Sequence, residues 1–369
     1  MEKSIIMKES GFVYRNPKPH LRSIVAYHPS LVLVGENELV ATFDLGQAVE
    51  AFDYHTELAR LVDGGTTWKL ERPLISQPPP STTHTIRTAR LADGSLVGLG
   101  GLHHRIDAEE GLVNRATFGF VPVDLFLVRS YDAGRSWTAP SHIEPPMVGP
   151  SWEICSPIVE LSDGRWLAPT ATWRGWNGDN PSGEMAVVLI SDDAGKSWPA
   201  FGLSFDGRES GHSHLEQSVL QLNDGRVLSV CWVIDVETGK NYPSEYSISA
   251  DRGETFSAPM HTGFKGQTCK VIQLLDGRLF CAYRRDDKPG LWATLAILEG
   301  EKWVNLEETP LWLGADSGMK GGTSSGQELS ILKFGYPSMK QLSNGDILLL
   351  FWCQEECITN VRWIRIGVK

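Results

Sequence analysis

The sequence predicts an all-β fold, a six-bladed β-propeller built from four-stranded antiparallel blades. Two hairpin motifs recur along the chain, short strands bounded by Gly, Pro, Asn and Asp lie between them, and helical periodicity is nearly absent. The 13 Trp suit this fold, because the wedges between blades need large side chains. We expect a single domain over residues 1–369, closed into a ring by strands near 4–14 and 361–368.

The first motif, Ser-x-Asp-x-Gly-x-Ser/Thr-Trp, predicts an outer hairpin in each blade. Its Asp accepts hydrogen bonds from nearby amides, its Gly supplies a positive φ, and its Trp packs back over the turn. The copies, some of them incomplete, are 63–68, 130–137, 191–198 and 249–256, with a degenerate turn at 298–303 that keeps the Trp. A spacing of roughly 60 residues indicates a repeated supersecondary unit.

The second motif, Leu-x-Asp-Gly-x-Leu/Val, predicts an inner hairpin, because Asp-Gly between two apolar runs is a strong turn signal. Its six copies, the first and third of them diverged, are 34–39, 91–96, 161–166, 222–227, 274–279 and 342–347. Six inner hairpins predict six blades.

Composition excludes several classes of function. A net charge of −11 without a basic patch argues against nucleic acid or an anionic membrane as partner. No apolar run approaches membrane length, and residues 1–18 lack the apolar region of a signal peptide, so we expect a cytoplasmic protein. The six Cys lack CxxC spacing, which favours buried thiols over disulfides or zinc. We expect no metal and no cofactor, and nothing in the sequence predicts the oligomeric state.

The two motifs together resemble the sialidase (neuraminidase) superfamily of BNR-repeat propellers, whose outer turns are called Asp-boxes. The resemblance covers nearly the whole chain. It implies a glycan or small-molecule substrate, bound on the face away from the Asp-boxes. Fold alone does not give function, so the site has to be argued from residues.

The repeats supply a register for the site, because inner strands of a propeller converge on its axis. Six residues before the Leu of the inner motif stand His28, Thr85, Cys155, Glu216, Thr268 and Tyr336. Ten residues after it stand Asp44, Gly101, Ala171, Trp232, Arg284 and Trp352. Polar and aromatic residues at equivalent positions predict a pocket on the axis.

The resemblance implies catalytic roles for two of these residues. Tyr336 is similar to the tyrosine nucleophile of the family, and Glu216 to the glutamate that polarises it. Asp44 or Asp53 is a candidate general acid, and a turn-capping role explains either one equally well. Glu153 is a candidate catalytic carboxylate facing Glu216, with a rim position as the alternative.

The substrate-binding candidates depart from the family pattern. Sialidases hold a sugar carboxylate with three arginines, whereas His28 and Trp232 stand where two of these are expected. Arg284 or Arg285 matches the third, and Arg87 offers a different anion contact. The substrate is therefore expected to be a glycoside other than ordinary sialic acid.

Three further residues are candidate ligand contacts. His84 is an acid–base or ligand candidate or a polar loop residue. Trp152 and Trp176 are sugar-stacking candidates or seals between blades. Three functions stay open: a glycoside hydrolase, a glycan-binding propeller without catalysis, and a polysaccharide lyase in which His84 and Tyr336 remove a proton from a uronic acid.

Overall fold

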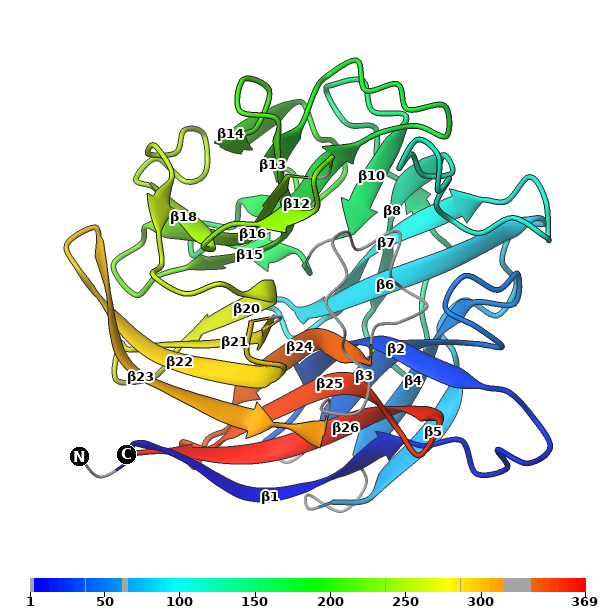
Figure 1. Cartoon of the computed structure of the whole chain (residues 1–369), viewed down its shortest axis with the longest axis horizontal. Coiled ribbons are helices and arrows are strands. Elements are labelled where there is room, and N and C mark those ends of the chain that lie inside the picture. The colour runs from blue at the N-terminus through cyan, green and yellow to red at the C-terminus, as the bar shows by residue number, and fades with distance from the viewer. Residues whose placement is uncertain are drawn as a thin grey trace.

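The computed structural model describes residues 3–36, 38–61, 66–154, 156–235, 237–285, 287–314 and 333–369. Six antiparallel sheets form a ring in which the first strand of each sheet lies nearest the centre (Figure 1), which confirms the predicted six-bladed propeller. No α-helix occurs within these ranges. A helix of the length and apolarity needed to cross a membrane is accordingly not found there.

Each blade is a meander of four principal strands, with one short extra strand in blades 3 and 4. Blade 1 contains β2 (Val25–Leu33), β3 (Leu39–Gly46), β4 (His55–Leu61) and β5 (Trp68–Pro73). Blade 2 contains β6 (Thr82–Arg90), β7 (Leu96–His104), β8 (Val123–Ser130) and β9 (Ser141–His142). Blade 3 contains β10 (Ser151–Ile154), β11 (Val159–Glu160), β12 (Trp166–Trp173), β13 (Met185–Ser191) and β14 (Ala200–Asp206).

The second half of the chain repeats this plan. Blade 4 contains β15 (His212–Gln221), β16 (Val227–Asp235), β17 (Lys240–Asn241), β18 (Glu245–Ser249) and β19 (Met260–His261). Blade 5 contains β20 (Gln267–Gln273), β21 (Leu279–Arg285), β22 (Gly290–Glu299) and β23 (Lys302–Trp312). Blade 6 contains β24 (Phe334–Gln341), β25 (Ile347–Glu355), β26 (Ile358–Val368) and the N-terminal strand β1 (Ile5–Tyr14).

The inner hairpins form where the Asp-Gly motif predicts them. In blade 2, Leu91 N donates to Ser95 O at 2.9 Å, and Gly94 adopts a φ of +86° that only glycine takes readily. The same hydrogen bond recurs at Leu161, Leu222, Leu274 and Leu342. The first, diverged copy still pairs Val34 with Glu38, although its Asn37 lies outside the described residues.

The outer turns join the third and fourth strands of blades 2, 3 and 4. Asp132 accepts hydrogen bonds from Ser130 Oγ at 2.8 Å and from Ser136 N at 2.8 Å. Asp193 and Asp251 make the equivalent contacts. The following aromatic residue fills the wedge toward the preceding blade, since Trp198 packs with Val97 and Leu127. Residues 62–65 of the copy at 63–68 lie outside the described residues.

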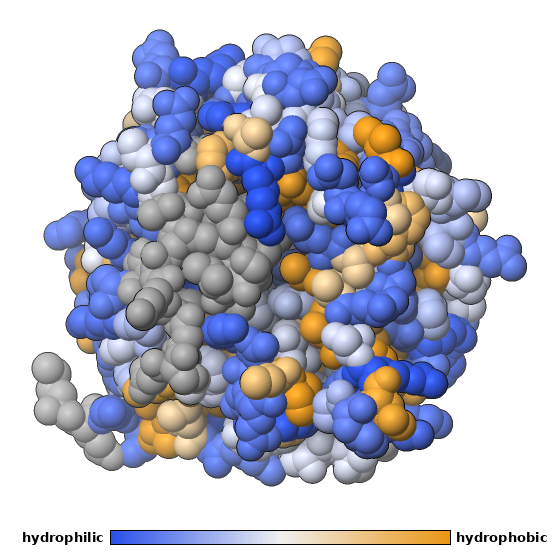
Figure 2. Space-filling view, turned by 45° about the vertical axis from the view of Figure 1, so that its right-hand side comes forward, coloured by the Kyte–Doolittle hydropathy of each residue, from blue (hydrophilic) through white to orange (hydrophobic). Residues whose placement is uncertain are grey.

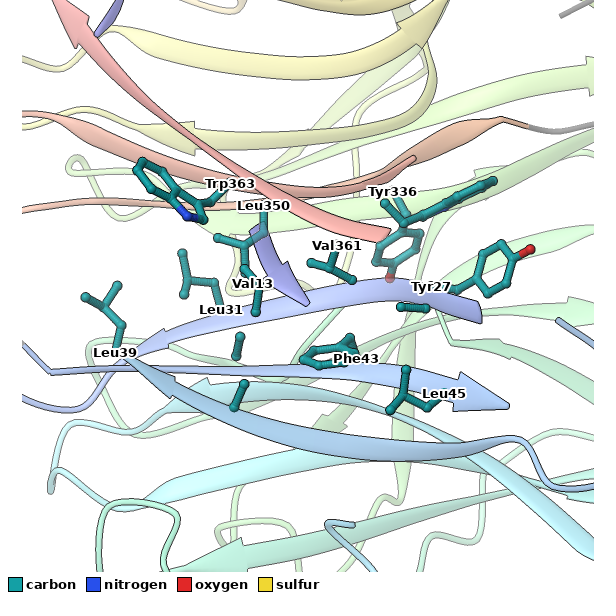
Figure 3. Packing of buried hydrophobic residues seen from close by; sticks show 14 of the residues in the cluster. Val13, Tyr27, Leu31, Leu39, Phe43, Leu45, Tyr336, Leu350, Val361 and Trp363 are labelled. Atoms are coloured by element: carbon teal, nitrogen blue, oxygen red, sulfur yellow. The ribbon is translucent and has the colours of Figure 1, made fainter. Parts of the chain in front are cut away.

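The two termini meet in blade 6. Strand β1 pairs with β26 from Ile5↔Val368 to Tyr14↔Val361, and both chain ends lie at the same edge of the ring (Figure 1). An apolar cluster joins this blade to blade 1, with Tyr336 at its edge beside Tyr27 (Figure 3). Burial of such clusters is the main stabilising term of the ring.

Serine side chains also join neighbouring inner strands. Ser30 Oγ accepts from Thr88 N, Ser218 Oγ from Val271 N, and Ser338 Oγ from Leu31 N, each at 3.0 Å. These bonds satisfy inner-strand amides between blades and hold the inner strands in a common register. Five of the six cysteines lie within the described residues and none of these forms a disulfide; Cys357 is exposed and the other four are buried.

Candidate functional site

The inner strands share an unusual backbone feature at the register positions. His28, Glu216, Thr268 and Tyr336 have φ between +47° and +53°, and each lies where the pairing of its strand shifts register. A non-glycine residue in this region is uncommon and costs on the order of 1 kcal/mol, and a bulge re-aims its side chain. Thr85 lies instead in an uninterrupted ladder, and Cys155 lies outside the described residues.

Three of these bulged residues, His28, Glu216 and Tyr336, line a pocket with a volume of about 200 Å³. Seven of the residues predicted from the sequence line it: His28, Thr85, Arg87, Trp152, Glu153, Glu216 and Tyr336. In Figure 2, apolar side chains gather beside a hollow near the middle of a face that is elsewhere mostly polar. Pockets for drug-sized ligands measure about 300–1,000 Å³, so this volume suits a single sugar ring better than a long oligosaccharide.

Tyr336 of blade 6 is held by a cation from blade 2, which lies two blades away in the ring. Arg87 Nε donates to the Tyr336 hydroxyl at 2.8 Å, and the guanidinium carbon lies 4.6 Å from the centroid of the tyrosine ring. Burial raises the pKa of Tyr336, the charges of Arg87 and Lys270 oppose that rise, and the charge of Glu216 adds to it. The phenol therefore lies among two cations and a carboxylate.

Lys270 is a site residue that the sequence argument missed. Its Nζ lies 4.6 Å from the Tyr336 ring centroid and donates to Glu216 O at 3.0 Å and to Ser156 Oγ at 3.3 Å. The residue is only 8% exposed. A lysine two positions after the register residue Thr268, within the apolar strand β20, was the available signal, because a buried lysine requires partners.

The two predicted glutamates lie together. Glu216 N donates to Glu153 Oε2 at 2.9 Å, which links blades 3 and 4 at the pocket. Glu216 Oε2 is buried, and none of the described residues hydrogen-bonds to it. One carboxylate is thus held by a backbone amide, and the other has a buried oxygen to which none of the described residues hydrogen-bonds.

Asp44 lies behind the pocket lining and is fully buried. It accepts hydrogen bonds from Thr85 Oγ1 at 2.6 Å, Thr56 Oγ1 at 2.7 Å and the Tyr54 hydroxyl at 2.9 Å. Burial by itself would raise the pKa of Asp44, but Arg87, with hydrogen bonds to the carboxylate, brings it to about 2. An ionised, enclosed carboxylate is poorly suited to protonate a leaving group, and this geometry favours a positioning role for Asp44.

Asp53 and His84 are not among the described residues that line the pocket. Asp53 is exposed and its carboxylate accepts from Gln47 N at 2.9 Å, which is the turn-capping alternative. His84 is 1% exposed, and its Nε2 accepts from Thr56 N at 3.3 Å. Burial lowers the pKa of His84 to about 4. It is His28 whose ring lies against Tyr336, with centroids 5.3 Å apart.

Four of the arginines and tryptophans predicted to contact a ligand bond to other parts of the protein instead. Arg284 donates to Gln267 Oε1 at 2.6 Å and Arg285 pairs with Asp287 and Glu308. Trp232 is buried and donates from Nε1 to Asn241 at 2.7 Å. Trp176 offers its main-chain carbonyl to Asn114 and Thr117. None of these four predicted residues is among those that line the pocket within the described part of the chain.

The long β7–β8 loop, residues 105–122, forms a wall that the repeat register did not predict. Its side chains Leu112, Val113, Phe118 and Phe120 line the pocket. Backbone pairing connects this loop to residues 174–175 after β12, because Phe120 N donates to Arg174 O at 2.8 Å. The loop lies outside both repeated motifs, so no periodic signal marked it.

Comparison with known proteins agrees with this fold. Residues 112–349 match the BNR repeat-like domain. A curated relative named Sialidase, from Bacteroides fragilis (strain YCH46), is 24% identical over an alignment of 244 residues that covers 59% of this chain and 43% of that protein. The chain thus spans less than half the length of this curated relative.

Solved structures show the same architecture at low identity. A Dyadobacter fermentans protein of unknown function has a TM-score of 0.75 at 20% identity, covering 99% of this chain and 100% of that one. A Penicillium chrysogenum alpha-L-arabinanase complexed with arabinobiose has a TM-score of 0.65 at 15% identity, covering 98% of both chains. The NanB sialidase from Streptococcus pneumoniae has a TM-score of 0.65 at 12% identity, covering 98% of this chain and 71% of that one.

Proposed function

This chain belongs to the BNR repeat-like domain family, and on that premise we propose that it is a glycoside hydrolase that removes a single neutral terminal sugar. The observation that carries the proposal is the pair of carboxylates, Glu153 and Glu216, that line one pocket beside Tyr336. Glycoside hydrolysis in most families uses two carboxyl groups that flank the scissile bond. The arabinanase and sialidase neighbours support a glycan substrate.

The two glutamates differ in a way that suggests their roles. Glu153 Oε2 accepts a backbone N–H, which suits a carboxylate that attacks the anomeric carbon. Glu216 Oε2 has no hydrogen-bond partner within the described residues and can carry the proton that the leaving oxygen needs as the glycosidic bond breaks. Water then takes the place of the leaving group, Glu216 accepts a proton from it, and the sugar–Glu153 bond is hydrolysed.

Charge supports a neutral substrate. Within the described pocket lining, Glu153 and Glu216 outnumber the single arginine, and Arg87 is already faced by Asp44 at 3.5 Å. Lys270, the second cation beside Tyr336, lies outside this lining and donates to Glu216 O. A sugar carboxylate in the pocket would therefore meet two negative groups and one lining cation that Asp44 shares, which is unfavourable in a low-dielectric pocket. A tyrosine nucleophile has its advantage with an anionic sugar, and a neutral sugar permits a carboxylate nucleophile. We therefore assign Tyr336 a positioning role next to the anomeric centre.

The test is turnover of fluorogenic glycosides by the whole chain and by single variants. We expect turnover of neutral glycosides and none of a sialoside, with Glu153→Gln and Glu216→Gln each lowering kcat by more than about 100-fold. Asp53→Asn is the matched control, because this exposed carboxylate caps a loop and should leave the rate unchanged. Full activity in either glutamate variant would refute the assignment.

Tyr336→Phe separates the two possible nucleophiles. A positioning role predicts a partial loss of kcat, whereas the nucleophile role implied by the sialidase resemblance predicts complete loss. Saturable ligand binding without turnover by any of these proteins would instead support a glycan-binding propeller.

One observation favours the lyase alternative. The His28 ring lies edge-on to Tyr336, with centroids 5.3 Å apart, and Arg87 donates to the same phenol. A base, a phenol and a cation are the groups needed to remove a proton beside a carboxylate. A lyase product absorbs in the near ultraviolet and a hydrolase product does not. Growth of that absorbance with a uronic-acid polymer would establish the lyase and overturn the hydrolase proposal.

A further inference from the structure

We infer that the pocket selects a sugar whose C5 carries no hydroxymethyl group, either a 6-deoxyhexose or a pentopyranose, with that edge turned toward the β7–β8 loop. This inference rests on the proposed glycosidase function and specifies its substrate. It comes from the division of the pocket into a charged half and an apolar half.

The charged half is built from inner strands of different blades. His28, Arg87, Glu216 and Tyr336 come from four first strands, and Glu153 comes from a fifth. These groups offer hydrogen-bond donors and acceptors to the anomeric centre and to ring hydroxyls. The side chains of the β7–β8 loop line the same pocket.

The apolar half is built mainly from the loop wall. Leu112, Val113, Phe118 and Phe120 supply four neighbouring side chains without a hydrogen-bonding atom. Leu215 and Ile234 of blade 4 also line the pocket and pack in a cluster with Phe118. Away from His103, which also lines the pocket with its ring centroid 5.8 Å from that of Phe120, a substrate hydroxyl placed against these groups would lose its bonds to water without replacement.

The wall is held in place by its own polar groups. Val121 N donates to Leu112 O at 3.0 Å and Asn114 N to Gly119 O at 2.8 Å, which closes the loop on itself. Asn114 Nδ2 and Thr117 Oγ1 donate to Trp176 O at 2.9 and 2.8 Å. These polar groups bond within the two loops, so the wall presents a preformed apolar surface.

The base of the loop is anchored in the same way. Arg105 is 5% exposed, and its guanidinium donates to the carbonyls of Glu110 at 2.6 Å and Glu50 at 3.0 Å. A rigid wall cannot move aside to admit water beside a hydroxymethyl group. The preference for one sugar over another then depends on the single group at C5. In apolar pockets one such group changes kcat/KM by roughly 10- to 200-fold.

The experiment compares three glycosides that differ only at C5. A β-D-galactoside, a β-D-fucoside and an α-L-arabinopyranoside carry CH2OH, CH3 and H on the same ring, and the glucoside, 6-deoxyglucoside and xyloside form a second such series. We expect kcat/KM for the methyl or hydrogen member to exceed that of the hydroxymethyl member by about 10-fold or more. The better of these two members distinguishes the deoxyhexose from the pentose.

Equal or greater kcat/KM for the hydroxymethyl member would overturn the inference while leaving the glycosidase proposal intact. If no glycoside is turned over, binding of the three methyl glycosides by calorimetry decides the inference separately, with the same order of affinity expected. Equal affinities would then refute it.

Val113→Thr provides a variant that tests the wall directly. It places a hydroxyl on the apolar surface with little change of volume, and should move the kcat/KM ratio at least several-fold toward the hydroxymethyl substrate. Val148→Thr is the matched control, because Val148 is 69% exposed and lies outside the pocket lining. An unchanged ratio in Val113→Thr would count against the wall as the specificity element.

Discussion

Arg87 and Tyr336 are 249 residues apart in the sequence, yet the Arg87 Nε lies 2.8 Å from the Tyr336 hydroxyl at the centre of the ring. This hydrogen bond connects blade 2 to blade 6, which are separated in the ring by blade 1. Behind it, Asp44 lies 3.5 Å from Arg87 Nη1, so a buried carboxylate, a guanidinium and a phenol form one chain of contacts. The stability of the fold and the ionisation of the site both depend on these contacts.

Removing the positive charge of Arg87 should destabilise the fold. Arg87→Met leaves the fully buried Asp44 without its counter-charge, and loss of one partner from a buried pair costs about 3–5 kcal/mol of unfolding free energy. Urea unfolding measures this loss. The double variant Arg87→Met with Asp44→Asn should recover much of it, whereas additive losses would mean that the two groups are not coupled.

Lys270 should control the ionisation of Tyr336. Lys270→Met removes a positive charge 4.6 Å from the phenol ring, so the pKa of Tyr336 should rise further. The ultraviolet signal of tyrosinate, followed against pH as the difference from Tyr336→Phe, measures this shift. Lys340→Met, on the same strand as Tyr336 but four residues along, is the control. Equal titration in both lysine variants would contradict the role of Lys270.

Two buried histidines should make the protein less stable in mild acid. Burial lowers the pKa of His84 to about 4 and that of His103 to about 3, against an ordinary value of 6.5. Between pH 6.5 and 4 the unfolded chain binds protons that the folded chain does not, so stability falls as pH falls, on the order of 3 kcal/mol for each histidine. Asp44, with a pKa of about 2, loses its contribution only below about pH 4.

Urea unfolding at a series of pH values tests this expectation. The slope of unfolding free energy against pH should be positive between pH 4 and 6.5, and it should shrink in His84→Gln and in His103→Gln. Exposed His142→Gln is the control, and its slope should match the unmodified chain. A flat profile in the unmodified chain would contradict the low pKa values.

Gly119 should be essential for the wall. A Cβ at this position would lie 1.8 Å from the carbonyl oxygen of Gly175, so Gly119→Ala forces the two loops apart. We expect KM to rise by about 10-fold or more while the inner-strand amides keep their hydrogen-exchange protection. In Gly35→Ala the nearest atom to the new Cβ is Glu38 Cβ at 3.4 Å, an ordinary contact, and this control should behave as the unmodified chain. An unchanged KM in Gly119→Ala would mean that the wall does not contribute to substrate binding.

Much of the site's location followed from the repeats. The register that placed Glu216 and Tyr336 on the axis was read from Asp-Gly turns, and both residues line the pocket together with His28. The bulges at these positions were not predicted, because positive φ at a non-glycine residue leaves no local sequence signal. Glu153 was expected to face Glu216, and the structure joins them by a hydrogen bond.

The predicted residues that lie outside the pocket are held by contacts that the local sequence does not predict. Arg284 stood at an expected position, yet Gln267 and the carbonyl of Phe334 hold its guanidinium. Lys270 was not predicted as a site residue because its partners, Ser156 and Glu216, come from other blades and are distant in the sequence. A long side chain takes its direction from the nearest charges in space.

The sequence by itself determined the number of blades, the hairpins within them and the strands that face the axis. Those features depend on turn chemistry and strand alternation, which act over a few residues. Only the tertiary structure decided which charges pair behind the pocket, which carboxylate oxygen is left without a partner, and that the β7–β8 loop forms an apolar wall. These features depend on contacts between residues from different blades, and ring closure fixes the distances between those residues.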